Sequence, residues 1–306
     1  MNKSYKLFLA AMLLGFIQIS SAQTASAALN VLACEPEWGA LARELGGEQV
    51  TVADATNALQ DPHRIEARPS LIAKARSAEL IVCTGSELEI GWLPLLLQQS
   101  GNANIQPGKP GYFEASALVR KLEIPTRLDR AEGDIHPGGN PHIQLDPRNI
   151  ARIAEGLAKR LAELDPAHAA QYQQRQADFA QRWQAAIKRW GVQAEPLKGI
   201  TIVVQHRAFP YLNEWLGLRE VATLEPKPGV EPSGSHLASV LEQLKHQPAR
   251  MVIRAAYNDD RPSLWIAERA KIPAVTLPFT VGGSEQAKDL FGLFDDTINR
   301  LLGALK

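Results

Sequence analysis

The stretch AHAAQYQQRQADFAQRWQAAIKRW, residues 167–190, decides how the chain is built. It contains neither proline nor glycine, and its apolar side chains recur at steps of three, four or seven residues, as on one helix face. The stripe consists of Ala169, Tyr172, Phe179, Trp183, Ile187 and Trp190, with Gln176 as its polar interruption. We expect one amphipathic helix about 35 Å long. An ordinary surface helix would show the same pattern, but the length and central position favour a rigid connection between two lobes.

The residues before this helix predict a first α/β lobe, residues 28–165. Short apolar runs predict strands at 29–33, 49–52 and 79–83, and periodic segments predict helices at 38–45, 69–77, 92–99 and 147–164. Strands that alternate with helices are typical of a parallel sheet covered by helices. Residues 101–140 are rich in glycine, proline and charge, so we expect an irregular segment there, of the kind that is usually functional or mobile.

The residues after the linking segment 166–195 repeat this layout in a second lobe, 196–306. Strands are expected at 200–204, 221–224, 251–253 and 274–277, and helices at 211–216, 236–245, 263–270 and 286–305. The predicted fold class is therefore α/β, with two lobes, each a parallel sheet covered by helices, joined by one long rigid helix.

The N-terminus has the pattern of a secretory signal peptide. Two lysines precede an apolar run at 7–19, and Ala25-Ser26-Ala27 fits an A-x-A cleavage rule, with Ser20-Ser21-Ala22 as a second option. The apolar run is too short for a comfortable membrane span. We therefore expect residues 1–27 to be removed and the chain to be exported to the periplasm. No cysteine lies at the cleavage region, so a lipid anchor is not expected.

The composition excludes several classes of function. Lys and Arg together number 33, as do Asp and Glu, so no basic field is present to hold nucleic acid. Neither a phosphate-binding glycine loop nor a G-x-S-x-G nucleophile turn occurs in the sequence. We expect a monomer without stable membrane insertion.

The two cysteines, Cys34 and Cys83, each end a predicted strand of the first lobe. If these strands are neighbours in a parallel sheet, the two sulfur atoms lie at the same edge and can form a disulfide in an oxidising compartment. Two buried free thiols are the alternative, because the Cα separation that a disulfide needs cannot be read from the sequence.

Three of the seven histidines, His63, His142 and His206, follow a strand or stand in a loop that leads into a helix. His142 follows Pro141 in a stiff loop, and Asp146-Pro147 then starts a helix with Asp as N-cap. Ligands of open α/β sheets gather at the carboxyl ends of strands. If both lobes turn these ends toward one cleft, the three imidazoles converge on a divalent cation.

Here the chain resembles a known family, the zinc and manganese solute-binding proteins of bacterial ABC importers. The resemblance covers the chain from Leu29 to the C-terminus. It rests on Asp61-Pro62-His63 with Pro69-Ser70, Glu87-Leu88-Glu89 with Trp92-Leu93, Asn140-Pro141-His142 with Leu145-Asp146-Pro147, His206 with Phe209 and Tyr211, and Glu231-Pro232-Ser233. It implies two lobes bridged by a helix, a metal held between them, and an inner-membrane permease as partner.

The resemblance implies that His63, His142 and His206 are metal ligands. The third ligand of the family is His in zinc-type members and Glu in many manganese-type ones, and imidazole suits zinc, so Zn²⁺ is favoured over Mn²⁺. The chain departs from the family at the fourth ligand, usually Asp in a Leu-Asp pair, because the pair here is Leu277-Pro278. A water is the default replacement. His136, Glu231 and Asp259 are further candidates, and His136 is counted with the three as an expected metal residue.

The expected function is therefore not enzymatic: a periplasmic protein captures Zn²⁺ with high affinity and delivers it to an ABC importer. A periplasmic zinc metallochaperone or sensor would share the same site. A hydrolase is the third reading, because zinc on three histidines keeps an open position where bound water has a pKa of about 7. No convincing general acid or base stands beside the three histidines, which disfavours this reading.

Overall fold

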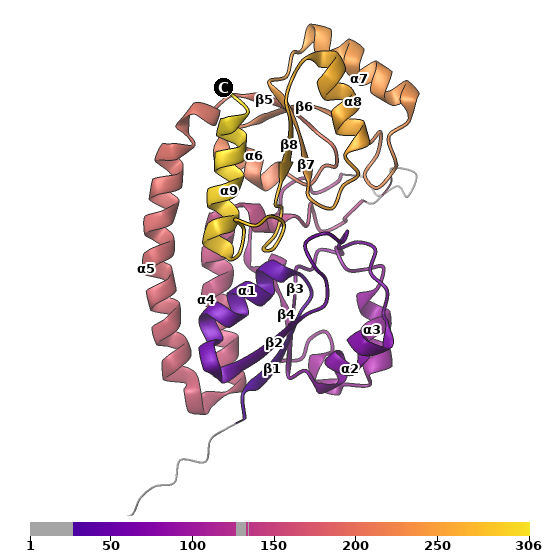
Figure 1. Ribbon diagram of the computed structural model, residues 1–306. Helices are drawn as coiled ribbons and strands as arrows, with labels where there is room; N and C mark the ends of the chain where they lie inside the picture. Colours follow the sequence, from indigo (N-terminus) through magenta and orange to yellow (C-terminus); the bar gives the residue numbers. More distant parts are fainter. Residues whose placement is uncertain (1–26, 127–132, 134) are drawn as a thin grey trace, which may run out of the picture.

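The computed structural model describes residues 27–126, 133 and 135–306. The predicted signal peptide lies outside these residues except for Ala27. The predicted fold class is confirmed: two parallel four-stranded sheets, each covered by helices, are linked by the long helix α5 (Ala169–Gln193), which runs along one side of both lobes (Figure 1). The proposed boundaries of the lobes stay a prediction.

The first lobe contains the sheet β2-β1-β3-β4, in which every neighbouring pair is parallel. Its strands are β1 (Leu29–Ala33), β2 (Val50–Asp54), β3 (Leu80–Cys83) and β4 (Tyr112–Glu114). Its helices are α1 (Pro36–Gly46), α2 (Pro69–Ser77), α3 (Leu93–Ser100) and α4 (Pro147–Leu164). As predicted, Asp146 caps α4: its side chain accepts a hydrogen bond from the backbone N–H of Arg148, 2.9 Å away.

Strand β4 lies inside the segment 101–140, for which we expected irregular structure, so this expectation was wrong at one point. Three residues are too few to show the alternation by which a strand is recognised in a sequence. The strand is held by pairing with β3, where Val82 lies opposite Phe113. It extends the sheet on the side away from β2.

The second lobe contains the parallel sheet β6-β5-β7-β8. Its strands are β5 (Thr201–Val204), β6 (Arg219–Thr223), β7 (Met251–Ala255) and β8 (Ala274–Leu277). Its helices are α6 (Pro210–Leu216), α7 (Gly234–His246), α8 (Arg261–Ala270) and α9 (Leu290–Gly303). The strand order matches that of the first lobe, so the carboxyl edges of both sheets have the same layout.

One hydrophobic core runs through both lobes. It includes Trp38 of α1, Trp183 and Trp190 of α5, and Phe294 of α9, all fully buried. The ring of Trp183 lies 5.1 Å from Trp190 and 5.4 Å from Phe294 between centroids. Two separate clusters pack α2 and α3, and α7 and α8, onto the outer faces of the sheets. Helix α5 thus joins the lobes through a shared core rather than as an exposed tether.

The two cysteines form a disulfide between the ends of neighbouring strands. Strands β1 and β3 pair in parallel, and the Cα atoms of Cys34 and Cys83 are 4.8 Å apart, within the usual disulfide range. Both side chains are fully buried. The bond links the ends of β1 and β3 at the carboxyl edge of the first sheet.

Within the described part of the chain, no helix combines the length and the hydropathy needed to cross a membrane.

Candidate metal centre

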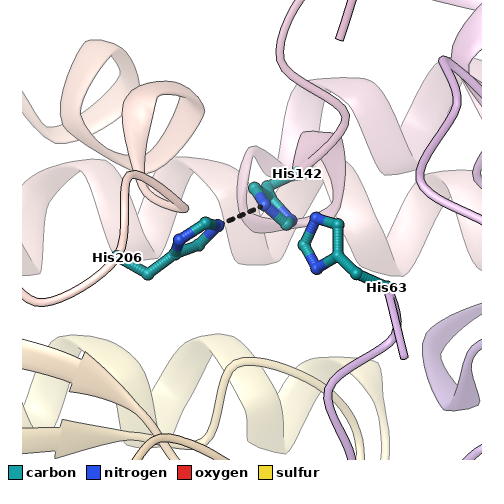
Figure 2. Close-up of side chains that lie close together, drawn as sticks. All are labelled: His63, His142 and His206. Carbon is teal, nitrogen blue, oxygen red and sulfur yellow. Dashed lines mark hydrogen bonds between the residues drawn. The ribbon is translucent and has the colours of Figure 1, made fainter. Parts of the chain in front are cut away.

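His63, His142 and His206 lie together between the two lobes, although 143 positions separate the first from the last. Figure 2 shows their rings turned toward one another. Their centroids form a nearly equilateral triangle: 5.2 Å from His63 to His142, 5.4 Å from His142 to His206 and 5.6 Å from His63 to His206. His142 and His206 are buried, and the side chain of His63 is 10% exposed.

A tight turn and a carboxylate orient His63. The Asp61 Oδ1 atom accepts hydrogen bonds from the backbone N–H of His63, 3.0 Å away, and from its ring nitrogen Nδ1, 2.7 Å away. The buried indole of Trp92 donates to the carbonyl of Pro62, 2.9 Å away, and fixes the loop on the first lobe. With Nδ1 as the donor to Asp61, the ring keeps the lone pair on Nε2 for the cleft.

His142 stands at the end of a loop that hydrogen bonds hold against both lobes. The Asn140 side chain accepts from the backbone N–H of His142 at 3.0 Å and donates to the carbonyl of Arg207 in the second lobe at 2.8 Å. The hydroxyl of Tyr211, on α6, donates to the Asn140 carbonyl at 2.8 Å. The Asn-Pro-His run therefore presents the imidazole from a loop that is fixed at several points.

His206 follows β5 and is oriented by Glu225, which follows the neighbouring strand β6. Its Nδ1 atom lies 2.7 Å from Glu225 Oε2, and the same oxygen accepts from the backbone N–H of Gly229 at 2.8 Å. Neighbouring parallel strands place these two residues at the same carboxyl edge. His206, like His63, thus carries a carboxylate behind its ring and turns Nε2 toward the cleft.

The three rings lie close enough together to share one divalent metal ion. The Nε2 atoms of His142 and His206 are 3.3 Å apart (Figure 2). Two nitrogens that each lie 2.0–2.1 Å from a tetrahedral zinc are separated by about 3.3 Å. One ligand nitrogen from each of the three residues falls within 4.8 Å of the others. The group can therefore hold a divalent metal ion with small side-chain adjustments.

The protonation state of His142 favours metal binding. Burial lowers the pKa of His142 well below its ordinary value, and repulsion from His63, His206 and His136 acts in the same direction. The ring is therefore neutral near pH 7, with its lone pair available. Burial alone would raise the pKa of Asp61, but its hydrogen bonds to His63 outweigh this and lower it, so the orienting group is a carboxylate.

The candidates for a fourth ligand take different positions. The ring of His136 lies 5.4 Å from that of His63 between centroids, at the edge of the group. Asp259 forms an ion pair with Arg261, with an Oδ2 to Nε distance of 2.8 Å, and Glu231 is exposed. Neither belongs to the group. Beside Pro278, which stands where the family usually has Asp, the ring of Phe279 packs on that of His142 at 5.5 Å between centroids.

An open cleft gives access to the site. It has a volume of about 450 Å³ and is lined by residues of both lobes and of the 101–140 segment. These are Glu123, Ile124, Pro125, Ile135, His136, Asn140, His142, His206, Arg207 and Pro228. His136, His142 and His206 therefore face the same cleft.

A buried carboxyl cluster lies beside the site in the first lobe. Glu35, Glu37 and Glu89 are each about 2–3% exposed. Burial raises the pKa of Glu37 and of Glu89 to about 7, and it raises that of Glu35 well above its ordinary value. Because these pKa values are raised, the stability that the cluster contributes is present at low pH and is lost as the pH rises through about 7.

Two groups with roles behind the histidines were missed from the sequence. Glu225 lies 19 positions after His206, and only the pairing of β5 with β6 brings them together. Tyr257 follows β7 and places a buried hydroxyl near the site. A search for polar residues directly after each predicted strand would have found Glu225, which follows the predicted strand 221–224, but not Tyr257.

Comparison with known proteins identifies relatives along nearly the whole chain. The metal ABC transporter substrate-binding lipoprotein ScbA from Streptococcus cristatus is 24% identical over 294 residues, which cover 92% of each chain. A crystal structure of ZnuA matches with a TM-score of 0.75 at 24% identity, over 91% of this chain and 100% of that one. The structure of the manganese-bound periplasmic metal binding protein from Candidatus Liberibacter asiaticus matches with a TM-score of 0.73 at 19% identity, over 90% of this chain and 99% of that one.

At these identities the structural matches show the shared fold alone. The family model described as zinc-uptake complex component A periplasmic goes further, because it matches residues 31–304, both lobes and all three histidines included. The chain therefore belongs to the zinc-uptake complex component A periplasmic family, the ZnuA family.

Proposed function

We propose that the protein captures Zn²⁺ outside the cytoplasm and delivers it to the inner-membrane permease of an ABC importer. The family consists of solute-binding proteins, so the chain is a binding protein and not an enzyme. The observation that carries the proposal is the convergence of His63, His142 and His206 from both lobes. A metal bound there contacts both lobes at once. Metal binding therefore changes the relative orientation of the lobes, and a permease can recognise this change.

The choice of zinc rests on the chemistry of the ligands. Three imidazole ligands suit zinc, whereas manganese prefers carboxylate and carbonyl oxygens. The carboxylates of Asp61 and Glu225 stand behind the rings and are not directed at the metal. Relatives of this fold bind different metals, and one is a manganese-bound protein. Because His63, His142 and His206 are all imidazoles, this group favours zinc.

His136 completes the proposed site as an auxiliary or fourth ligand. Its ring borders His63 and lines the open cleft, so a modest loop movement brings it to an ion held by the other three. In this arrangement His136 meets the ion first and then helps to exclude water from it. When it points away, a water takes the fourth position.

A metallochaperone that passes zinc to a periplasmic partner would use the same site, and it differs only in the partner. A hydrolase is not supported. The buried carboxyls Glu35 and Glu37 line a second, smaller cavity beside His142 and not the open cleft. Glu123, the carboxylate that lines the open cleft, accepts hydrogen bonds from Arg207 at 3.0 Å and from Asn140 at 3.1 Å, which disfavours a role as a general base.

Metal competition tests the choice of zinc. Calorimetric titration of the metal-free protein with Zn²⁺ and Mn²⁺, using a competing chelator for tight binding, should show zinc bound at least about 100-fold more tightly, in the direction of the general affinity order. His206→Glu should narrow this gap by weakening zinc and strengthening manganese. Tighter binding of Mn²⁺ than of Zn²⁺ by the unaltered protein would rule out the proposed metal.

A further inference from the structure

The three histidines differ in what stands behind their rings. His63 and His206 each place Nδ1 2.7 Å from a carboxylate oxygen. His142 has no such group: its Nδ1 atom is buried and has no hydrogen-bond partner among the described residues. A buried polar atom without a partner costs about 1–3 kcal/mol. A metal-binding histidine, moreover, almost always donates its second ring nitrogen to something. The environment of His142 Nδ1 thus needs an explanation.

A second, smaller cavity that His142 also lines lies between the lobes. Its lining comes from the first lobe through Glu35 and Glu37, and from the second lobe through Tyr257 and Phe279. The space open to a water-sized sphere is about 10 Å³, about what one water molecule requires. His142 thus lines both spaces, the open cleft and this small cavity.

Two other residues that line this cavity, Tyr257 and Glu35, each have a buried oxygen atom without a hydrogen-bond partner among the described residues. The hydroxyl of Tyr257 is buried and has no hydrogen-bond partner among the described residues. Glu35 accepts hydrogen bonds from Thr84 on Oε2, 3.0 Å from the Thr84 hydroxyl. Among the described residues no N–H or hydroxyl group donates to its Oε1, although its carboxyl group also interacts with that of Glu89. Three polar groups of the lining can therefore bind a water molecule: His142 Nδ1, the Tyr257 hydroxyl and Glu35 Oε1. A buried water typically makes about three hydrogen bonds.

We infer that this cavity is a binding site for one ordered water, held by Tyr257 and Glu35, that accepts the Nδ1–H of His142 and so orients the ring toward the metal. Tyr257 is then a positioning residue for the metal site. The inference rests on the proposed function, since it assigns the missing partner of one proposed ligand. The proposed water joins Tyr257 of the second lobe to His142 and Glu35 of the first, so both lobes contribute to the orientation of the His142 ring.

The chemistry of Tyr257 fits this role. Burial raises its pKa well above the ordinary value, and the negative charges of Asp61 and Glu225 add to the effect. The side chain therefore stays a neutral hydroxyl that both donates and accepts. Its ring packs against that of Phe279 at 5.4 Å, which in turn packs on His142, so the hydroxyl is held by rigid aromatic contacts.

Tyr257→Phe tests the inference, because it removes the hydroxyl and keeps the ring. We expect zinc affinity to fall about 10-fold, the low end of the usual effect of losing a group that orients a metal ligand. In ¹⁵N-histidine NMR spectra of the zinc-loaded protein, we expect the Nδ1–H proton of His142 to exchange faster with solvent and to change its chemical shift. The signals of His63 and His206 should stay in place, because their carboxylate partners are intact.

Tyr112→Phe is the matched control, since Tyr112 lies in β4 and takes no part in lining the cavity. It should leave affinity and the His142 signal unchanged. Unaltered zinc affinity and His142 exchange in Tyr257→Phe would overturn the inference, as would a loss of affinity with an unchanged His142 signal. If zinc shifts none of the three histidine signals in the unaltered protein, the proposed function itself fails, which is a different result.

Discussion

Replacing His142 with alanine is expected to weaken zinc binding by roughly a hundredfold or more. A four-ligand protein zinc site contributes about 10–16 kcal/mol, so one ligand accounts for about 3 kcal/mol, or about two powers of ten. His142 is the most deeply placed of the three, at 2% exposure, and its Nε2 atom lies 3.3 Å from that of His206. Titration calorimetry with a competing chelator measures the change.

The His142 variant should remain folded, because the ring is neutral and its Nδ1 atom has no partner among the described residues. Circular dichroism of the metal-free protein checks this. His246→Ala, in the exposed last turn of α7, is the control and should bind zinc like the unaltered protein. Equal zinc affinity in the two variants would contradict the assignment of His142.

Trp183→Ala is expected to lower the free energy of unfolding by about 3–5 kcal/mol, the usual cost of removing a buried Trp side chain. Trp183 is fully buried at the middle of α5 and donates from Nε1 to the carbonyl of Pro147, 2.8 Å away, at the start of α4. Its ring also contacts Phe291 of α9, 4.8 Å away between centroids. The substitution thus opens a cavity in the core that the lobes share.

Urea denaturation followed by circular dichroism measures this loss. Gln184→Ala, the exposed neighbour on the same helix, should change stability by less than about 0.5 kcal/mol. A Trp183 variant as stable as the Gln184 variant would show that α5 is a peripheral helix and not the support of both lobes.

The fold was accessible from the sequence wherever periodicity was strong. The stripe from Tyr172 to Trp190 predicted α5 because its large apolar residues pack on one side, and all but Ile187 of its aromatic and aliphatic members are buried. The N-cap at Asp146 followed from local chemistry alone. Strand β4 was missed because three residues carry no period, and only its pairing with β3 defines it.

In the candidate site, too, some residues could be predicted from the sequence and others could not. His63, His142 and His206 were recognisable because each sits beside proline-containing turns or a strand end. Their partners depend on tertiary neighbours. Glu225 reaches His206 only because β6 pairs with β5, and Tyr257 reaches the cavity behind His142 only because the second lobe closes on the first. The Cys34–Cys83 bond was left open for the same reason, since strand order decides it.

The arrangement of core and site together suggests how loading is communicated. A shared core along α5 limits the lobes to small movements, while the three histidines come from both lobes, so that a small rotation of one lobe changes their spacing. We therefore expect a bound ion to tighten the cleft by a small closure rather than by a wide hinge motion.

The most direct measurement is a crystal structure of the zinc-loaded protein with anomalous diffraction recorded at the zinc edge. We predict one strong anomalous peak between the lobes, about 2.0–2.1 Å from the Nε2 atoms of His63, His142 and His206. A fully occupied zinc peak elsewhere, with these three nitrogens not bonded to any common ion, would contradict the proposed site.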